Sequence, residues 1–230
     1  MKTPMLPGQA AAPDGPVDLS MMYLMHHAFR RDLRDFASAV PRTPLEDVVT
    51  WRALLRRWEL FAAALHHHHR SEDTWLWPAL LERADAAEQA TLGAMEAEHE
   101  EIDPLLTSCA CLLDKLAGGT SSPDERSALA VRLVAARESL GRHLAHEETD
   151  ALRIVQRHLT QADWDTIDAH FAEGLPARQL LALVPWALHG LPARVRRELL
   201  AQARPAQRVA WRLTRGRFGR LDARAFGHAG

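Results

Sequence analysis

Residues 61–80 read FAAALHHHHRSEDTWLWPAL, an apolar helix face interrupted by one histidine and one glutamate. Phe61, Leu65, His68 and Glu72 recur at intervals of three and four residues, which places them on one side of a helix. Ionisable side chains on a side that packs into a core are costly to bury unless something pairs them. The stretch therefore predicts a long amphipathic helix with a polar pair facing the protein interior.

Three other segments have the same apolar spacing, and each carries one histidine on its apolar side. The first segment contains His26, the third contains His99 and the fourth contains His143. In the fourth segment Glu147 follows His143 at the spacing already seen in the second. Four amphipathic segments joined by short connections predict an all-α protein built on an up-down four-helix bundle.

Capping signals mark several helix ends. Thr43-Pro44-Leu45-Glu46 and Ser122-Pro123-Asp124-Glu125 each combine a capping box with proline at the first helical position. They predict the starts of the second and fourth helices. Gly118-Gly119 predicts the end of the third helix, and Thr160 predicts the cap of a fifth.

The chain divides into three parts by composition. Residues 1–17 are rich in proline, glycine and alanine and predict a flexible leader. Residues 18–160 form the predicted bundle, and residues 161–230 form an arginine-rich helical extension packed on it. Within the extension we expect a mobile stretch over about the last ten residues, preceded by short helices at 161–172, 177–189, 192–203 and 205–214.

Charge is unevenly distributed along the chain. Residues 175–230 carry eleven arginines and two acidic residues, a net charge of +9, whereas residues 1–174 carry 17 basic and 28 acidic residues. The favoured interpretation is that the basic extension lies against the acidic bundle. Nucleic acid and an anionic membrane are less favoured partners.

The sequence also bears on location. No apolar stretch reaches the ~18 residues that a membrane-spanning helix needs, and the N-terminus lacks the apolar run of a signal peptide. Cys109 and Cys111 are too few for a disulfide scaffold and predict small buried thiols. We therefore expect a cytoplasmic protein.

The four histidines and two glutamates have the chemistry of a metal site. His68 and Glu72 lie one helical turn apart, as do His143 and Glu147, while His26 and His99 add one imidazole each from the other two helices. Mixed imidazole and carboxylate ligation suits iron, manganese or zinc. Six donors exceed the needs of one tetrahedral zinc ion, which favours two ions or one of higher coordination.

Helical register separates the candidate ligands from their neighbours. His26 aligns with Met22 and Phe29, whereas His27 is rotated by about 100°. In the run of four histidines the same test selects His68, leaves His69 as a neighbour or additional ligand, and places His66 and His67 in solvent. Tyr23, one turn before His26, is a core residue or a hydrogen-bond donor to a bound oxygen species.

These stretches resemble the hemerythrin-like family, in particular its HHE cation-binding branch. The resemblance covers about residues 18–160 and rests on MHHAFRRDL at 25–33, HHRSE at 68–72, WPAL at 77–80, EHEEI at 98–102 and HLAHEE at 143–148. It implies a non-haem di-iron (Fe2+/Fe3+) centre, with manganese or zinc less favoured. In this interpretation Glu72 and Glu147 bridge the ions, and the terminal ligands are His26, His68, His99 and His143.

One position departs from the oxygen-carrying hemerythrins. They have a second histidine one turn after the one that corresponds to His99, whereas this chain has Asp103. Asp103 is either an additional ligand or a surface residue. The departure argues against reversible oxygen carriage and favours binding or reduction of O2, H2O2 or NO. If the protein is an enzyme, we expect a di-iron oxidoreductase that consumes peroxide or O2.

Other interpretations stay open. The protein could be a non-enzymatic iron or oxygen sensor that acts through its basic extension, or a structural bundle without metal. A ferritin-like di-iron site is weaker, because it needs Glu-x-x-His motifs on two helices. Glu96 and His99 supply one such motif, but Leu140 stands three residues before His143. The oligomeric state and the electron donor are not assigned.

Overall fold

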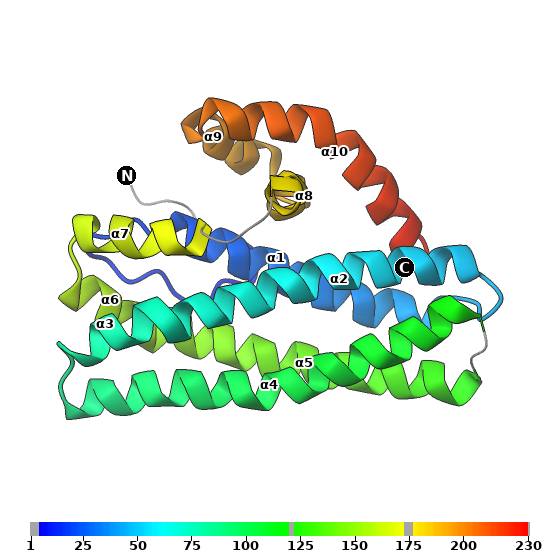
Figure 1. Cartoon of the computed structure of the whole chain (residues 1–230), viewed down its shortest axis with the longest axis horizontal. Coiled ribbons are helices and arrows are strands. Elements are labelled where there is room, and N and C mark those ends of the chain that lie inside the picture. The colour runs from blue at the N-terminus through cyan, green and yellow to red at the C-terminus, as the bar shows by residue number, and fades with distance from the viewer. Residues whose placement is uncertain (1–4, 120–121, 173–176, 230) are drawn as a thin grey trace.

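A computed structural model describes residues 5–119, 122–172 and 177–229 of the chain (Figure 1). Every regular element within these residues is helical, which confirms the all-α class. The bundle consists of α1 (Ser20–Ala39), α2 (Val48–Ser71), α4 (Ala86–Gly118) and α5 (Pro123–His146). Each of these helices runs antiparallel to the next, and α2 packs on α4, α4 on α5 and α5 on α1. The predicted up-down four-helix bundle is therefore confirmed.

The predicted start of the second helix at Thr43 is wrong. The Thr43 hydroxyl donates to the carbonyl of Ala39 over 2.9 Å and so belongs to the end of α1. The helix α2 begins at Val48, where the Asp47 carboxylate accepts the backbone N–H of Thr50 over 3.1 Å. An aspartate caps a helix as well as a threonine does, and the cap of α2 is Asp47, four residues after Thr43.

The other three capping signals are confirmed. Ser122 and Glu125 form the capping box of α5, and Gly119 ends α4 with a left-handed φ of 79°. The Thr160 hydroxyl accepts the backbone N–H of Asp163 over 3.2 Å at the start of α7 (Gln161–Ala172). The ends of α4 and the starts of α5 and α7 were therefore readable from local sequence.

Both helices that carry a His-x-x-x-Glu pair change to a π-helical turn at the glutamate. These turns and the helices that follow them are Glu72–Leu76, leading into α3 (Trp77–Leu81), and Glu147–Ala151, leading into α6 (Leu152–His158). A π turn adds one residue to the turn and so shifts the apolar face by one position. As a result Trp75, three residues after Glu72 and so aligned with the apolar face of a regular α-helix, is 43% exposed, and Leu76 is buried instead.

The apolar core has two parts, and a polar layer separates them. In all four bundle helices the candidate ligands lie where one part gives way to the other. The flanking pairs of core residues are Met22 and Phe29, Leu65 and Leu76, Met95 and Ile102, and Leu140 and Ala151. The ionisable side chains are thus enclosed by apolar packing on both sides along the bundle axis.

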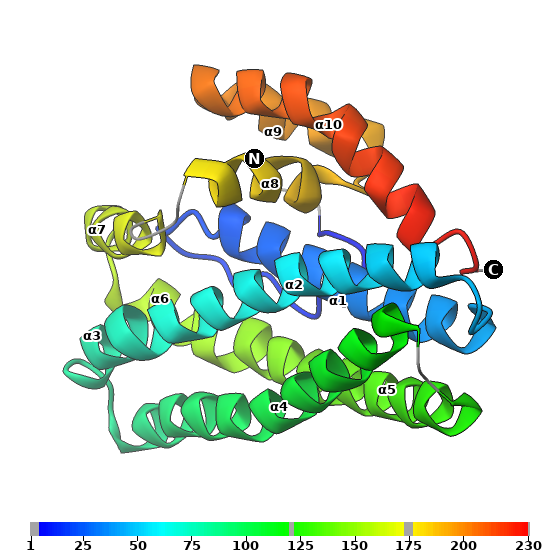
Figure 2. The ribbon, with the colours of Figure 1, turned by 45° about the vertical axis from the view of Figure 1, so that its right-hand side comes forward.

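The extension forms a further layer over α1 and α2 (Figure 2). After α7 it consists of α8 (Ala177–Leu188), α9 (Ala193–Gln202) and α10 (Pro205–Ala225). The first three predicted helices are correct to within one residue at each end. The predicted short helix at 205–214 and the mobile end are wrong, because α10 packs on α2 and α8 and buries Phe218 and Ala225. The division of the chain at residues 17 and 160 stays a prediction.

A fully buried carboxylate joins the bundle to the extension. Asp32 of α1 accepts hydrogen bonds from Arg31 over 2.6 Å, from Arg57 over 2.9 Å and from the indole N–H of Trp186 over 2.8 Å. Arg31 also donates to the carbonyl of Trp186 over 2.8 Å. The ionic contact that holds α8 therefore uses arginines of the bundle.

The charge polarity at this interface is the reverse of the predicted one. Asp222 of α10 lies 3.3 Å from Arg57 of α2 and 2.9 Å from His189. The guanidinium of Arg57 also lies over the ring of Phe218, 4.7 Å from its centre. At this pair the bundle contributes the cation and the extension contributes the acid. Among the described residues no arginine of the extension lies within ion-pair distance of a bundle carboxylate, whereas His228 of the extension lies 3.3 Å from Asp47.

The Asp222 carboxylate is expected to make docking of the extension depend on pH. Burial raises the pKa of Asp222, but His189 and Arg57 outweigh burial and lower it overall. A carboxylate whose pKa is lowered by folding stabilises the folded state. This stabilisation is complete above the pKa of the unfolded chain, about 4, and is lost as the pH falls through the pKa of the folded state. We expect the difference in unfolding free energy between the wild type and Asp222→Asn to shrink below pH ~4. Urea titrations over a pH series measure it, and a pH-independent difference would contradict it.

Residues 5–17 of the predicted flexible leader lie along the bundle, as do residues 18 and 19. Leu6 and Val17 are buried, and the side chain of Gln156 pairs with both backbone polar groups of Val17 over 2.9 Å. The backbone N–H of Ala10 donates to Glu148 over 2.6 Å. The leader thus reaches a carboxylate beside the polar layer, a contact that its composition does not reveal.

The two cysteines differ in environment. Cys109 is buried, and burial raises the pKa of its thiol to about 12, whereas Cys111 is exposed. The prediction of a buried thiol is correct for Cys109 and wrong for Cys111. A disulfide-based thiol titration at pH 8 is expected to detect one thiol per native chain and both after denaturation. Rapid reaction of both thiols in the native protein would contradict this assignment.

The described helices lack the combination of length and hydropathy that crossing a bilayer requires. This agrees with the expectation from the sequence.

Candidate metal centre

Four of the six predicted ligands form one compact group. His26 of α1, His68 of α2, Glu72 and Glu147 each offer a nitrogen or oxygen atom, and these atoms lie within 4.8 Å of one another. All four side chains are buried. Four ionisable groups buried this close together need a shared partner.

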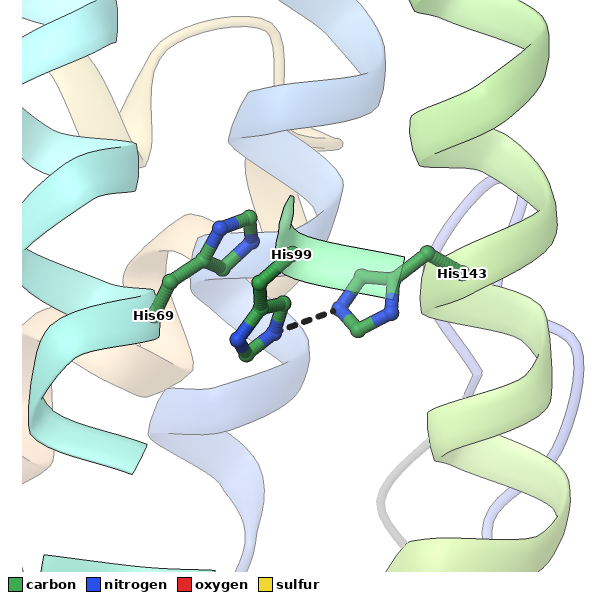
Figure 3. A group of neighbouring side chains, drawn as sticks. All are labelled: His69, His99 and His143. Carbon is green, nitrogen blue, oxygen red and sulfur yellow. Dashed lines mark hydrogen bonds between the residues drawn. The ribbon is translucent and has the colours of Figure 1, made fainter. Parts of the chain in front are cut away.

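The remaining two predicted ligands form a second group with a third histidine. His99 of α4, His143 of α5 and His69 of α2 are buried and again offer atoms within 4.8 Å of one another (Figure 3). The ring of His69 stacks on that of His99 with 3.8 Å between centres and 7° between planes. His69, which the sequence left as a neighbour or additional ligand, is thus a full member of this group.

Each glutamate lies between the histidines of the first group and those of the second. Glu72 Oε1 is 3.2 Å from His68 Nε2 in the first group, and its Oε2 is 3.6 Å from His99 Nε2 in the second. Glu147 Oε2 is 3.2 Å from His26 Nε2 and 3.9 Å from His143 Nε2. Within the described part of the chain no N–H is directed at any of the four carboxylate oxygens with hydrogen-bonding geometry. Each glutamate thus has a histidine nitrogen of both groups within 3.9 Å.

Outer carboxylates set the orientation of three imidazoles. The Nδ1 atoms lie 2.8–2.9 Å from an acid in the pairs His26–Glu148, His99–Asp73 and His143–Glu98. A carboxylate can only accept, so each of these Nδ1 atoms carries the hydrogen. The lone pair of each neutral ring is then on Nε2, which points to the inside of the layer. Metal-binding histidines are held in the same way.

The pair His99 and His143 shows what this orientation requires. Their Nε2 atoms are 3.1 Å apart (dashed in Figure 3), while Asp73 and Glu98 hold both Nδ1 hydrogens. Two neutral rings in this arrangement direct lone pairs at each other, which is repulsive. A cation bound by both nitrogens turns the repulsion into two favourable bonds. The two groups of side chains can hold metal ions.

The pKa values of the two glutamates are shifted in opposite directions. Burial, and then the charge of Glu147, hold the pKa of Glu72 well above its usual range. Burial also opposes ionisation of Glu147, but His26, His143 and His68 outweigh it and lower the pKa of Glu147 to about 2. A cation shared by both carboxylates would allow both to ionise.

Most of the imidazoles are held in the neutral form that binds metals. Burial lowers the pKa of His68, His69 and His143, in the first two well below the usual value. Burial also lowers the pKa of His26, but Glu147 and Glu148 outweigh it and raise that pKa to about 9. A bound cation would compete with the His26 proton for the Nε2 lone pair.

The outer partners were missed at the sequence level. Asp73 and Glu148 directly follow the two central glutamates, so Glu72-Asp73 and Glu147-Glu148 are one motif used twice. Arg30 holds Glu148 with a bidentate pair of hydrogen bonds of 2.7 and 3.0 Å. The repeated acidic pair was a visible signal, whereas the histidine that each acid contacts depends on how the helices pack.

Other candidates lie outside both groups. Asp103 is exposed on α4, so the structure gives no support to it as a ligand. His27 is buried but joins neither group, as register predicted. His66 is exposed as expected, whereas His67 is half-buried with its Nε2 2.7 Å from the carbonyl of Phe171.

Tyr23 is half-buried, and its hydroxyl has no hydrogen-bond partner among the residues that the structure describes. Burial, followed by the charges of Glu148 and Glu147, raises the pKa of Tyr23. The hydroxyl therefore keeps its hydrogen and remains available as a donor on the α1 side of the layer.

The outer carboxylate of His99 offers a direct test of ligand orientation. Asp73→Asn is expected to weaken metal affinity about 10- to 100-fold, because asparagine holds the Nδ1 hydrogen less strongly and makes the ring a poorer donor. Competition with a chromogenic chelator measures the affinity. Glu100→Gln, an exposed change on α4, is the matched control and is expected to have no effect. Equal affinities for the wild type and Asp73→Asn would contradict the orientation.

Comparison with known proteins gives one match. A family model described as the hemerythrin HHE cation-binding domain matches residues 17–155, more than half of the chain. The matched region contains every member of the two groups and ends before the extension. The comparisons with curated proteins and with solved structures found no match.

Proposed function

Because the chain belongs to the hemerythrin HHE cation-binding domain family, we propose that its polar layer binds two iron ions and that this di-iron site binds or reduces a small oxygen or nitrogen species, namely O2, H2O2 or NO. Two groups of metal-ligating atoms with two carboxylates between them support the two-ion proposal.

One observation carries the proposal. His99 and His143 each have the Nδ1 hydrogen committed to an acid, yet their Nε2 atoms lie 3.1 Å apart. In the same layer Glu72 and Glu147 are buried with both oxygens of each lacking a hydrogen-bond donor. Donor atoms arranged in this way are unfavourable without a cation and favourable with one.

The ligands would divide between the ions as the two groups do. His26 and His68 would hold one ion, His69, His99 and His143 the other, and Glu72 and Glu147 would bind both. The ion held by three imidazoles and two carboxylates would have five protein donors, more than tetrahedral zinc uses, so iron is favoured over zinc, and manganese prefers a higher share of oxygen ligands. The side with two imidazoles has fewer protein donors, which favours it as the place where a small molecule binds.

When bound, a pair of irons supplies two one-electron redox centres side by side. The chain's own residues would provide the surroundings of the metal site. Leu65, Met95 and Leu140 are buried beside the polar layer and would give the site apolar walls. The Tyr23 hydroxyl would donate a hydrogen bond to the incoming molecule.

Metal analysis and visible spectroscopy test this proposal. We expect two irons per chain after loading with ferrous iron under anaerobic conditions, and a new visible absorption after addition of H2O2, O2 or NO. Tyr23→Phe is expected to keep the iron and slow the spectral change. Protein that retains no iron, or that gives no spectral response to any of the three molecules, would overturn it.

A second candidate function is a sensor that acts through the extension. The ring of Phe29 lies 5.2 Å from that of His68 and 5.5 Å from that of Trp186 in α8. A shift of His68 on metal binding would therefore move Phe29 and change its contact with Trp186, where the extension packs on the bundle. Limited proteolysis of the extension with and without iron tests this, and identical digestion would argue against it.

A further inference from the structure

The outer surface of the extension is strongly basic. Nine arginines of α9, α10 and the turn between them are exposed: Arg194, Arg197, Arg204, Arg208, Arg212, Arg215, Arg217, Arg220 and Arg224. Those on α10 cover the side of the helix opposite to Phe218 and Ala225, which pack inward. We call this side of α10, from Arg208 to Arg224, the basic face. Figure 2 shows α10 at the outside of the molecule, above α8.

The positive charge of the basic face is not neutralised within the described part of the chain. Asp222 is the acidic residue of α10, and it lies among Arg57 and His189 on the inner side. Glu198 of α9 pairs with Arg194 over 2.9 Å. The arginines of the basic face have no carboxylate within ion-pair distance among the described residues, so their charge is available to an external anion.

Exposed apolar side chains stand among these arginines. Leu213 is 76% exposed and Val209 is 53% exposed, one helical turn apart. Trp211 is half-buried, and the guanidinium of Arg215 lies 4.5 Å from the centre of its ring. A helix that combines arginines with exposed aliphatic residues and an indole has the chemistry of a segment that lies at a lipid–water interface.

We propose that the basic face of α10 binds the surface of an anionic phospholipid bilayer. The arginines would contact lipid phosphates while Leu213 and Val209 enter the headgroup region. This occupant fits better than nucleic acid, because the basic face combines arginines with the exposed aliphatic side chains of Val209 and Leu213. On a phosphate backbone Leu213 would stay in water, whereas at a bilayer it is buried.

Vesicle sedimentation with the full chain tests the proposal. We expect the protein to sediment with phosphatidylcholine vesicles that contain phosphatidylglycerol and to stay in solution with phosphatidylcholine alone. Higher salt is expected to weaken binding, since it screens exposed charges. Sedimentation that does not depend on the anionic lipid would overturn the proposal.

Two variants separate the charge from the apolar contribution. Arg212→Gln/Arg217→Gln/Arg220→Gln is expected to weaken binding roughly 100-fold, about fivefold for each arginine. Leu213→Gln is expected to weaken it severalfold while leaving the salt dependence intact. Both changes are at exposed positions, so thermal unfolding should match the wild type.

A charge-matched control removes three exposed arginines from the bundle. Arg56→Gln/Arg137→Gln/Arg153→Gln lowers the net charge by the same amount and is expected to bind vesicles like the wild type. An equal loss in this control would mean that net charge acts alone, and would overturn the assignment to α10. Tighter binding to duplex DNA than to the vesicles, unaffected by Leu213→Gln, would identify nucleic acid instead.

Discussion

Glu72→Gln and Glu147→Gln are each expected to lower the iron content of the protein by at least half. Each glutamate lies between the two groups of histidines, within 3.9 Å of a histidine nitrogen in both. Glutamine keeps the shape but removes the negative charge that would bridge two cations. The loss in affinity should exceed the roughly 10- to 100-fold effect of changing an outer carboxylate. Elemental analysis and chelator competition give the two quantities.

The metal-free protein separates this effect from a folding defect. The raised pKa of Glu72 favours its protonated form, which glutamine resembles, so Glu72→Gln should leave the unfolding free energy of the metal-free protein nearly unchanged. Glu59→Gln, an exposed change on α2, serves as the control for both measurements. Wild-type iron content in both Glu72→Gln and Glu147→Gln would show that these residues do not bind the metal.

Asp32→Asn is expected to destabilise the folded chain by about 3–5 kcal/mol, the usual effect of leaving buried charges unpaired. Asp32 and Arg57 are fully buried and Arg31 is almost so. The neutral amide of asparagine cannot balance the charge of the two guanidinium groups. Its NH2 group is a donor, and it would stand where a carboxylate oxygen now accepts hydrogen bonds. Urea-induced unfolding measures the loss.

The same variant should loosen the extension more than the bundle. Trp186 donates its indole N–H to Asp32 over 2.8 Å, so limited proteolysis of the extension, compared with that of the bundle, reports on the docking of α8. Asp35→Asn, one helical turn away beside exposed Arg34, is the control and is expected to change stability by less than about 1 kcal/mol. A loss for Asp32→Asn as small as that of the control would contradict the role of Asp32 as the ionic centre of the interface.

Periodicity was sufficient for the framework of the bundle. It identified four core-facing helices and selected His26 over His27, because each helix shows its inner side through its own apolar spacing. It also identified six of the seven buried donors, since an ionisable residue on an apolar face stands out against its neighbours. The family model over residues 17–155 agrees with this framework.

The same test left His69 open, as a neighbour or an additional ligand. Register along one helix selects the position that faces a single site, which is His68. In the structure there are two groups of candidate ligands, so adjacent positions of α2 each face one of them. Trp75 departs from the apolar spacing for a different reason, because the π turn at Glu72 shifts the helix face and no propensity scale marks such a turn.

By itself the sequence determined the helices, their inward sides and the residue types that meet in the polar layer. These follow from the spacing of side chains along single helices, which is a local property of the chain. Only the tertiary structure decided that Asp73 orients His99, that Glu148 orients His26, and that Arg57 rather than an arginine of the extension secures the docked layer. Such pairings join residues far apart in the chain, and they depend on how helices rotate and pack against each other, which the spacing within one helix does not encode.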